Sequence, residues 1–428
     1  MEILSTGEKI KRARIYKGYT LKSLCDNKIS VSKMSCIEND KIKPEQWILE
    51  FVADKLEVDM EYLEQDVKSQ IIKNINDISK NPPAENYEKV LWYNLKFAEG
   101  YSYYNICFTI IHMLFNYHLD RNEFEKMQFI VSPYYEYLQK CFSNKNASMY
   151  YMDIARYFYV SKEYFQAINY YDNVLNICRK SDYNEYLAKA MYCKAFCYFI
   201  IKDYDKAYEL AMKIIDLEDS TGESIENVEV YHMLAVISLK MHTNKFEKYE
   251  KKVYELYKND LKSKSEAMFD YAQVLFSLKK KDRALNYLNK SLDIYPKDNI
   301  KELVNFMLMS IDDLVKNKVM KRAHAICDVT LDYAISLNNI TFIEKAYYYK
   351  ALILLKEGDF TRGEMYMNFS LDNLLKFGTS SEIYKRYMEM GKMYYNINNV
   401  SESIKYFSFA INLKEKYKFL SDKKCTYV

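Results

Sequence analysis

Apolar residues recur every three or four positions along most of the chain, which is the spacing that places them on one face of an α-helix. Over residues 1–66 this pattern is divided into short stretches at 8–16, 21–25, 31–39, 44–56 and 60–63. Thr20, Ser30 and Asp59 stand just before three of them, where a side-chain oxygen accepts hydrogen bonds from first-turn N–H groups. Pro44 stands in the first turn of the fourth, where its missing N–H costs nothing. The pattern predicts a domain of five short helices over residues 1–66.

The five predicted helices share enough apolar residues for a small core, namely Ile10, Leu24, Ile29, Met34, Ile37, Leu49, Val52 and Leu56. Charge is unevenly divided within this segment. Residues 1–43 hold ten Lys and Arg against five Asp and Glu, whereas residues 44–66 hold one against eight. Since the whole chain has a net charge of only +3, the basic stretch stands out, and a basic face on a small helical domain is typical of nucleic-acid binding.

The segment GEKIKRARIYKGYTLKSLCDNKISVSKMSCIENDKIKP resembles the Xre/Cro-type helix-turn-helix through its G-x-x-I-x-x-x-R, T-x-x-x-L and S-x-x-x-x-S-x-I-E-N elements, and the likeness runs over residues 7–56. The resemblance implies a buried ion pair between Arg14 and Glu38. It also implies that the helix from Ser30 to Asn39 enters the major groove of DNA with its N-terminal residues at the base edges.

The resemblance places Val31, Ser32, Lys33 and Cys36 toward the groove. Lys33 would donate to guanine and Val31 would meet a thymine methyl group. The chain departs from the family pattern at Leu21, where Gln is common, and in lacking Gln on the recognition helix. Further DNA contacts are expected from Thr20 at the start of the second helix and, on charge alone, from Lys9, Arg12, Lys22, Lys41 and Lys43. Trp47 lies beside the apolar stripe of its helix and is expected to pack locally, on the rest of the chain or on a second copy.

Residues 67–100 are expected to form a linker helix region, broken at Asn81-Pro82-Pro83 because two prolines stop a helix. Beyond it, over 101–428, small residues recur at intervals of 37 to 40: Ala155, Ala195, Ala235, Ala272, Ala351 and Gly391, with Ile311 in the gap. A second series follows twelve residues later, at Ala167, Ala207, Ala284, Ala323, Gly363 and Ser403. An earlier, degenerate unit fits around Phe115 and Met127. Together these repeats predict about eight helical hairpins.

This layout resembles the TPR repeat, best in SEAMFDYAQVLFSLKKKDRALNYLNKSLDIYPKD. The fold class is therefore all-α, a helix-turn-helix domain followed by a TPR-like solenoid. Such arrays present a concave surface lined by the first helix of each pair. The repeat phase assigns to that surface Arg156, Lys189, Tyr192, His232, Gln273, Asn305, Tyr348, Lys385 and Lys392. Amides, cations and tyrosines suit an extended peptide, whose backbone and carboxylate need such partners.

An Xre-type domain followed by about eight degenerate TPR hairpins resembles the RRNPP regulators, the peptide-pheromone receptors of Gram-positive bacteria, and most closely their clostridial RstA-type members, which control sporulation and toxin genes. The resemblance implies a homodimer that binds operator DNA and changes state when a short signalling peptide enters the array, a quorum-sensing type of control. Two alternatives stay open. One is a TPR scaffold that sequesters a response regulator, and the other is a repressor without a ligand.

Other functional classes find little support in the sequence. It contains no Gly-rich phosphate loop, no H-E-x-x-H and no G-x-S-x-G, so we expect no enzyme. Nine cysteines without a C-x-x-C pair, and His112 and His118 on different helix faces, predict neither a metal site nor a cofactor. Without a run of 18 apolar residues or an apolar leader, we expect a cytoplasmic protein with no membrane partner.

Overall fold

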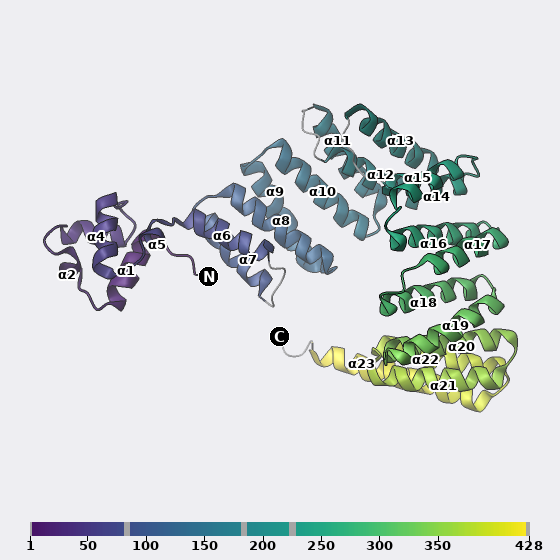
Figure 1. Cartoon of the computed structure of the whole chain (residues 1–428). Coiled ribbons are helices and arrows are strands. Elements are labelled where there is room, and N and C mark those ends of the chain that lie inside the picture. The colour runs from purple at the N-terminus through teal and green to yellow at the C-terminus, as the bar shows by residue number, and fades with distance from the viewer. Residues whose placement is uncertain (1, 81–85, 181–185, 222–227, 425–428) are drawn as a thin grey trace. The chain divides into compact units, whose positions relative to one another are not determined.

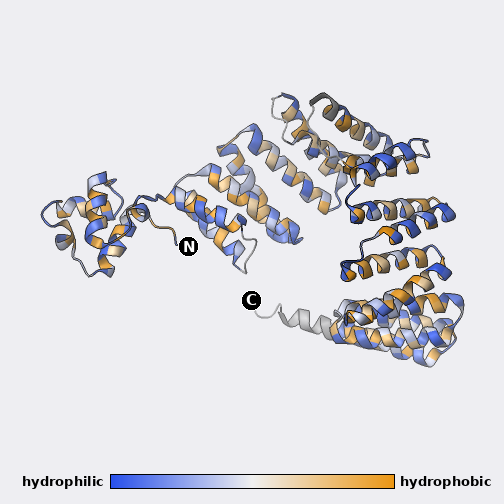
Figure 2. Ribbon diagram, in the orientation of Figure 1, coloured by the Kyte–Doolittle hydropathy of each residue, from blue (hydrophilic) through white to orange (hydrophobic). Residues whose placement is uncertain are grey.

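The computed structural model describes residues 2–80, 86–180, 186–221 and 228–424, and these form 23 α-helices without a β-strand (Figure 1). The chain divides into two compact units, Met1–Leu217 and Glu218–Val428. The break predicted at residues 81–83 lies outside the described residues. Hydrophilic and hydrophobic residues alternate along nearly every helix (Figure 2), as the apolar periodicity requires. Among the described helices, none is long and apolar enough to cross a membrane.

The first unit begins with five short helices: α1 (Thr6–Tyr16), α2 (Leu21–Cys25), α3 (Val31–Glu38), α4 (Gln46–Leu56) and α5 (Met60–Glu64). Ser5 and Glu8 form a reciprocal capping box at the start of α1. Thr20, Ser30 and Asp59 each accept a backbone N–H at the start of their helix, as their positions in the sequence predict. Local side-chain chemistry therefore fixes where most of these helices begin.

The core of this helical head contains all the apolar residues named from the sequence, from Ile10 to Leu56. One glycine determines how closely two of its helices approach. A Cβ atom on Gly7 would lie 2.2 Å from the carbonyl oxygen of Ile37. The backbone N–H of Gly7 also donates to Asp40 at 3.0 Å. The glycine of the motif thus has a steric cause, because only glycine lets α1 lie this close to the end of α3.

Residues 67–100 form a hairpin of α6 (Val67–Lys80) and α7 (Tyr87–Gly100). Its apolar residues, Val67, Ile71, Ile75, Leu91 and Leu95, belong to the same buried cluster as those of the following helices. We predicted a linker helix region from the proline pair, whereas the structure makes this hairpin a packed part of the first unit. The reason is that the apolar stripe of α6 and α7 needs a partner surface, and the next helix supplies it.

A short N-terminal strap, residues 2–5, runs from α1 onto this hairpin. Ile3 is buried among the apolar residues of α6 and α7. The side-chain amide of Gln70 accepts the N–H of Leu4 at 3.1 Å and donates to its carbonyl at 2.8 Å. The Ile3 N–H donates to the Tyr93 hydroxyl at 3.1 Å. The head is therefore joined to α6 and α7 both through this strap and through the chain between α5 and α6.

Helical pairs follow to the end of the chain. In the first unit they are α8 (Tyr104–Asp120) with α9 (Phe124–Lys140), α10 (Asn144–Val160) with α11 (Tyr164–Lys180), and α12 (Leu187–Ile200) with α13 (Tyr204–Thr221), whose last turn passes the boundary at Leu217. In the second they are α14 (Val228–Lys240) with α15 (Phe246–Leu256), α16 (Leu261–Ser277) with α17 (Lys281–Ile294), α18 (Ile300–Lys316) with α19 (Met320–Ser336), α20 (Ile340–Glu357) with α21 (Phe360–Phe377), and α22 (Ser380–Asn396) with α23 (Val400–Lys424).

Both series of small residues lie where the paired helices touch. Every alanine of the two series is fully buried, as is Ile311, which fills the gap in the first series. A Cβ atom on Gly363 would lie 2.7 Å from Leu355, and one on Gly391 would lie 2.6 Å from Phe407. The Ser403 hydroxyl donates to the Gly391 carbonyl at 2.8 Å. Small side chains recur because each pair brings two backbones close together.

The repeat is also visible in the backbone of the turns. A residue with positive φ stands between the two helices of each pair, at Asn122, Lys162, Lys202, His242, Lys279, Lys318, Gly358 and Asn398. These positions follow the same 37 to 40 residue spacing that the small residues showed. Each pair thus closes with a left-handed residue just after its first helix, a common way to end an α-helix. The structure is therefore an all-α solenoid carrying a small helical head.

Candidate functional site

The recognition helix predicted from the motif is α3, and its first turn is open to solvent. Val31 is 42% exposed and Ser32 is exposed, while Lys33 and Cys36 are partly buried. Met34 and Ile37 are buried on the opposite side. The buried side of the helix therefore anchors it in the head, while Val31 and Ser32 of the expected groove residues are open to solvent and Lys33 and Cys36 are partly covered.

Arg14 and Glu38 hold α3 against the rest of the head. Arg14 Nε lies 2.6 Å from one carboxylate oxygen of Glu38 and Nη2 lies 2.9 Å from the other, a two-point contact. The Arg14 side chain is 13% exposed and that of Glu38 only 3%. Hydrogen bonding to Glu38 raises the pKa of Arg14. A third bond, from Arg14 to the Tyr19 carbonyl at 2.9 Å, ties the pair to the turn before α2.

Lys33 has partners at the edge of the expected interface. Its ammonium group lies 2.8 Å from the carboxylate of Glu45. The indole N–H of Trp47 donates to the same carboxylate at 2.6 Å, and Lys33 lies 5.8 Å from the center of the Trp47 ring. These contacts lower the pKa of Glu45, the hydrogen bond from Lys33 most of all. Trp47 itself is 45% exposed, and its contacts are local.

The residues expected to contact phosphate on charge alone divide into two groups. Thr20, Lys22, Lys41 and Lys43 are exposed. Lys9 is 1% exposed and donates to the carbonyls of Tyr62 and Gln65 at 2.6 and 2.5 Å, and burial lowers its pKa. The expectation for Lys9 was therefore wrong, because this ammonium group caps the end of α5. Arg12 is half-exposed and pairs with Glu2 at 2.7 Å.

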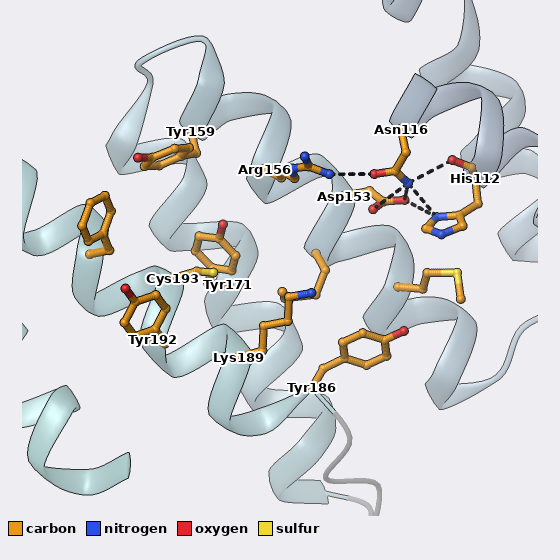
Figure 3. A pocket seen from close by; sticks show the side chains of 13 residues that line it. His112, Asn116, Asp153, Arg156, Tyr159, Tyr171, Tyr186, Lys189, Tyr192 and Cys193 are labelled. Carbon is orange, nitrogen blue, oxygen red and sulfur yellow. Dashed lines mark hydrogen bonds and ion pairs between the residues drawn. The ribbon is translucent and has the colours of Figure 1, made fainter. Parts of the chain in front are cut away.

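A cavity of about 550 Å³ opens in the array part of the first unit, between α8, α10 and α12. It is lined by His112, Asn116, Met149, Met152, Asp153, Arg156, Tyr159, Tyr171, Tyr186, Lys189, Tyr192, Cys193 and Phe196. Its volume falls within the range typical of small-molecule sites. Three of the residues expected to line the concave surface, Arg156, Lys189 and Tyr192, come together here (Figure 3).

A hydrogen-bonded cluster forms one side of this cavity. The buried carboxylate of Asp153 lies 2.5 Å from Nδ1 of His112 and accepts the Tyr134 hydroxyl at 2.7 Å. Asn116 donates to the same carboxylate at 3.4 Å. Burial, with the neighbouring Asp153 as the next cause, raises the pKa of Tyr134. The charge of Asp153 is thus already surrounded by His112 and Asn116 of α8 (Figure 3) and by Tyr134 of α9.

Sequence reasoning missed the members of this cluster. His112 was considered only as a metal ligand, and Asp153 was not considered at all. Asp153 lies two residues before Ala155, the small residue of this repeat, and three residues before Arg156, so it occupies the same turn of the helix. An acidic residue within an otherwise apolar helical stretch was the available signal.

The other residues expected on the concave surface belong to the second unit. Asn305 borders two cavities there, of about 790 and 350 Å³, and Tyr348 and Lys385 line the second of these. Lys392 lines a third cavity of about 340 Å³ together with Tyr348. The remaining two, Gln273 and His232, bind the next helical pair.

Gln273 donates to Asp313 at 2.6 Å, and His232 lies 3.1 Å from Asp270. Burial raises the pKa of Asp313. Both contacts join one helical pair to the next, so these two side chains already have partners within the array.

A separate cluster of His118, Glu88 and Glu123 has the residue types of a metal site. The two glutamates already share a cation, since Lys126 lies 3.0 Å from Glu88 and 3.3 Å from Glu123. His118 is buried and its Nδ1 lies 2.6 Å from Glu123. The cluster therefore acts as an ion-pair network that ties α7 to the turn between α8 and α9.

No family model matches this sequence, and no curated protein matches it. Among solved structures, the apo form of RapI has a TM-score of 0.49 and 15% identity and covers 82% of this chain and 98% of that one. Apo NprR of B. thuringiensis has a TM-score of 0.40 and 17% identity, covering 83% and 100%. Bacillus thuringiensis PlcR, solved with the peptide PapR7 and DNA, has a TM-score of 0.33 and 16% identity, covering 59% and 94%. At these scores the likenesses carry no argument about function.

Proposed function

We propose that this protein is a sequence-specific DNA-binding transcriptional regulator of the RRNPP kind, whose TPR-like array binds a short signalling peptide. The observation that carries the proposal is the two-point contact of Arg14 with Glu38. A buried ion pair of this kind fixes the orientation of α3. The helix that it fixes has an open first turn, at Val31 and Ser32, and exposed lysines follow it at 41 and 43.

The head has the means for both parts of DNA recognition. The first turn of α3 offers side chains that read base edges, with Lys33 the strongest hydrogen-bond donor among them. Lys22, Lys41 and Lys43 are exposed cations that would contact phosphates without regard to sequence. Lys33 must leave Glu45 to reach a base, and since that pair is partly exposed its loss costs little.

The peptide part of the proposal rests on the cavity between α8, α10 and α12. Aromatic and methionine side chains form its walls, and cations from two helices stand at its edge. A concave, mostly apolar cavity with a few polar groups is the usual form of a ligand site. The second unit has two cavities of its own that Asn305 borders, and their polar lining would also suit a peptide backbone.

A homodimer completes the proposal, because two copies of α3 on one operator would reach half-sites about one DNA turn, ~34 Å, apart. The last helical pair is the candidate surface for self-association. Val400, Ile404 and Ile411 on α23 are 57%, 60% and 56% exposed. Terminal repeats of a solenoid usually carry a polar outer face, so exposed apolar residues there favour contact with a second copy.

DNA binding is tested by selecting duplexes from a random pool with the full chain and titrating the best of them in a gel shift. We expect Lys41→Ala to weaken binding alike for all duplexes and to lower the salt dependence by about one phosphate contact. Lys33→Ala should in addition relax the base preference. Lys68→Ala, an exposed lysine on α6, is the matched control.

Two outcomes would contradict the proposal. If the full chain enriches no duplex, the protein does not read DNA, and a scaffold that sequesters a response regulator becomes the better reading. If Lys33→Ala and Lys41→Ala together leave the gel shift unchanged while circular dichroism shows an intact fold, α3 does not dock on DNA as described.

A further inference from the structure

Arg156 joins two helical pairs across the edge of the cavity in the first unit. Its Nη2 lies 2.7 Å from the carboxylate of Asp120, the last residue of α8, and its Nη1 donates to the side-chain oxygen of Asn116 at 3.0 Å. Asn116 and Arg156 both line the cavity. Figure 3 shows Arg156 extending from α10 toward Asn116. The guanidinium group therefore lies at the cavity wall, paired with the carboxylate of Asp120.

The ion pair is weakly held. The side chain of Arg156 is 49% exposed and that of Asp120 is 61% exposed. Pairs this open to solvent contribute little to stability, because water and salt screen them. A second anion that offered the same geometry in a less hydrated place would displace Asp120 at small cost.

The cavity provides such a place. Lys189 projects from α12 toward the same space (Figure 3) and, among the residues that the structure describes, has no ion-pair partner. Two cations, Arg156 and Lys189, thus face a cavity in which Asp153, the one carboxylate among the described lining residues, is already bound by His112 and Tyr134.

Most of the remaining wall is apolar or aromatic, with Asn116 a polar exception. Met149, Met152, Tyr159, Tyr192 and Phe196 contribute to it. Such a wall favours an apolar group and would leave a charged one without partners. The complementary molecule therefore has an apolar body and one anionic end, with a planar carboxylate the best match for a guanidinium fork.

We propose that this cavity binds an apolar group ending in a carboxylate. The carboxylate displaces Asp120 as the ion-pair partner of Arg156 and also pairs with Lys189. The inference rests on the proposed function in one respect, since the C-terminal end of a short signalling peptide is one source of such a group. A free apolar carboxylic acid is the other source.

The exchange also provides a route by which the ligand changes the head. In the free protein Arg156 holds the end of α8 to α10, and the bound ligand releases it. The apolar residues of α8 share one buried cluster with α6, α7 and Ile3 of the N-terminal strap. The strap leads directly into α1, whose first residue follows Ser5. A movement of α8 on ligand binding would reach the strap and α1 through these packed side chains.

The test is isothermal titration calorimetry of the full chain with three probes. The first is acetyl-Ala-Ala-Leu-Phe with a free carboxylate, the second is the same peptide with a C-terminal amide, and the third is phenylbutanoate. We expect the peptide acid to bind at least tenfold more tightly than the amide, because a charge-assisted pair is lost. Binding of phenylbutanoate as strong as that of the peptide acid would identify free acids as the source.

Variants separate Arg156 from a general charge effect. Arg156→Gln should weaken binding of the acid about tenfold or more and leave the amide unchanged. Asp120→Asn should strengthen binding of the acid roughly two- to fivefold, because the competing anion is gone. Arg283→Gln is the matched control, since Arg283 pairs with Glu247 at 3.1 Å at a similar exposure and the same separation of 36 residues, but in the second unit.

Equal affinity for acid and amide would overturn the inference, as would weaker binding by Asp120→Asn or no binding of any probe at millimolar concentration. These measurements need no DNA, so they stand even if the chain binds no operator. Where an operator has been selected, the acid should change its affinity by roughly 5- to 150-fold in the wild-type chain and not in Arg156→Gln.

Discussion

Replacing Arg14 by methionine removes one partner of the ion pair that orients α3. Methionine has a similar length and fills most of the same space, so the change tests charge rather than packing. Glu38 then keeps a carboxylate that is 3% exposed and has lost both of its Arg14 contacts. The bond from Arg14 to the Tyr19 carbonyl is lost as well.

The expected cost follows from this burial. Removing one partner of a buried ion pair costs about 3 to 5 kcal/mol, because the other charge stays uncompensated. A domain the size of the 1–66 head has a stability of roughly 3 to 10 kcal/mol at typical values per residue. Arg14→Met should therefore bring the head close to unfolding while the array, whose core is separate, stays folded.

Hydrogen exchange followed by mass spectrometry measures the loss of stability separately for the head and for the array. We expect the amides of α3 and α4 to exchange roughly two to four powers of ten faster in Arg14→Met than in the wild type, since ~1.4 kcal/mol corresponds to a factor of ten. Amides of α16 to α21 should not change. Lys17→Met is the matched control, because it removes the exposed pair with Glu57 and should cost at most ~1 kcal/mol.

The double variant Arg14→Met/Glu38→Met completes the test. Two apolar side chains in place of a buried pair are often neutral or stabilising, so protection of α3 should largely return. If Arg14→Met exchanges no faster than Lys17→Met, or if the double variant is as unprotected as the single one, the buried carboxylate is not the cause and the reasoning is refuted.

Three further changes have clear expectations. Gly7→Ala should lower the melting temperature of the head, because its Cβ would lie 2.2 Å from the Ile37 carbonyl oxygen; an unchanged melting curve would contradict this contact. Hydrogen bonds from Ser69, backbone first, lower the pKa of Asp66, so its stabilising effect is present above the unfolded pKa of about 3.9 and is lost as the pH falls through the folded pKa. Asp66→Asn should therefore reduce the loss of stability on acid titration. Ile404→Glu should shift any dimer toward monomer in light scattering, and an unaltered mass would place the interface elsewhere.

Local features of the sequence were sufficient to predict the helices of this protein and their repeat. The helix starts at Thr20, Ser30 and Asp59 depend on side chains that accept hydrogen bonds from backbone N–H groups two or three residues later. The residues next to each start therefore determine it. The series of small residues is periodic because each hairpin repeats the same close contact, and self-similarity along a chain is visible without a structure. The all-α class and the order of head and array follow from these two kinds of signal.

Only the tertiary structure determined which residues far apart in the chain contact one another. Lys9 reads as a surface cation, yet it is buried because the end of α5 folds over it. The α6 and α7 hairpin reads as a linker, yet it shares the core of α8. Arg156 was assigned to the ligand surface by repeat phase, but its engagement by Asp120, 36 residues earlier, was not foreseeable. Repeat phase shows which face of a helix a residue occupies, whereas the rotamers and crossing angles of packed helices decide which atoms it meets.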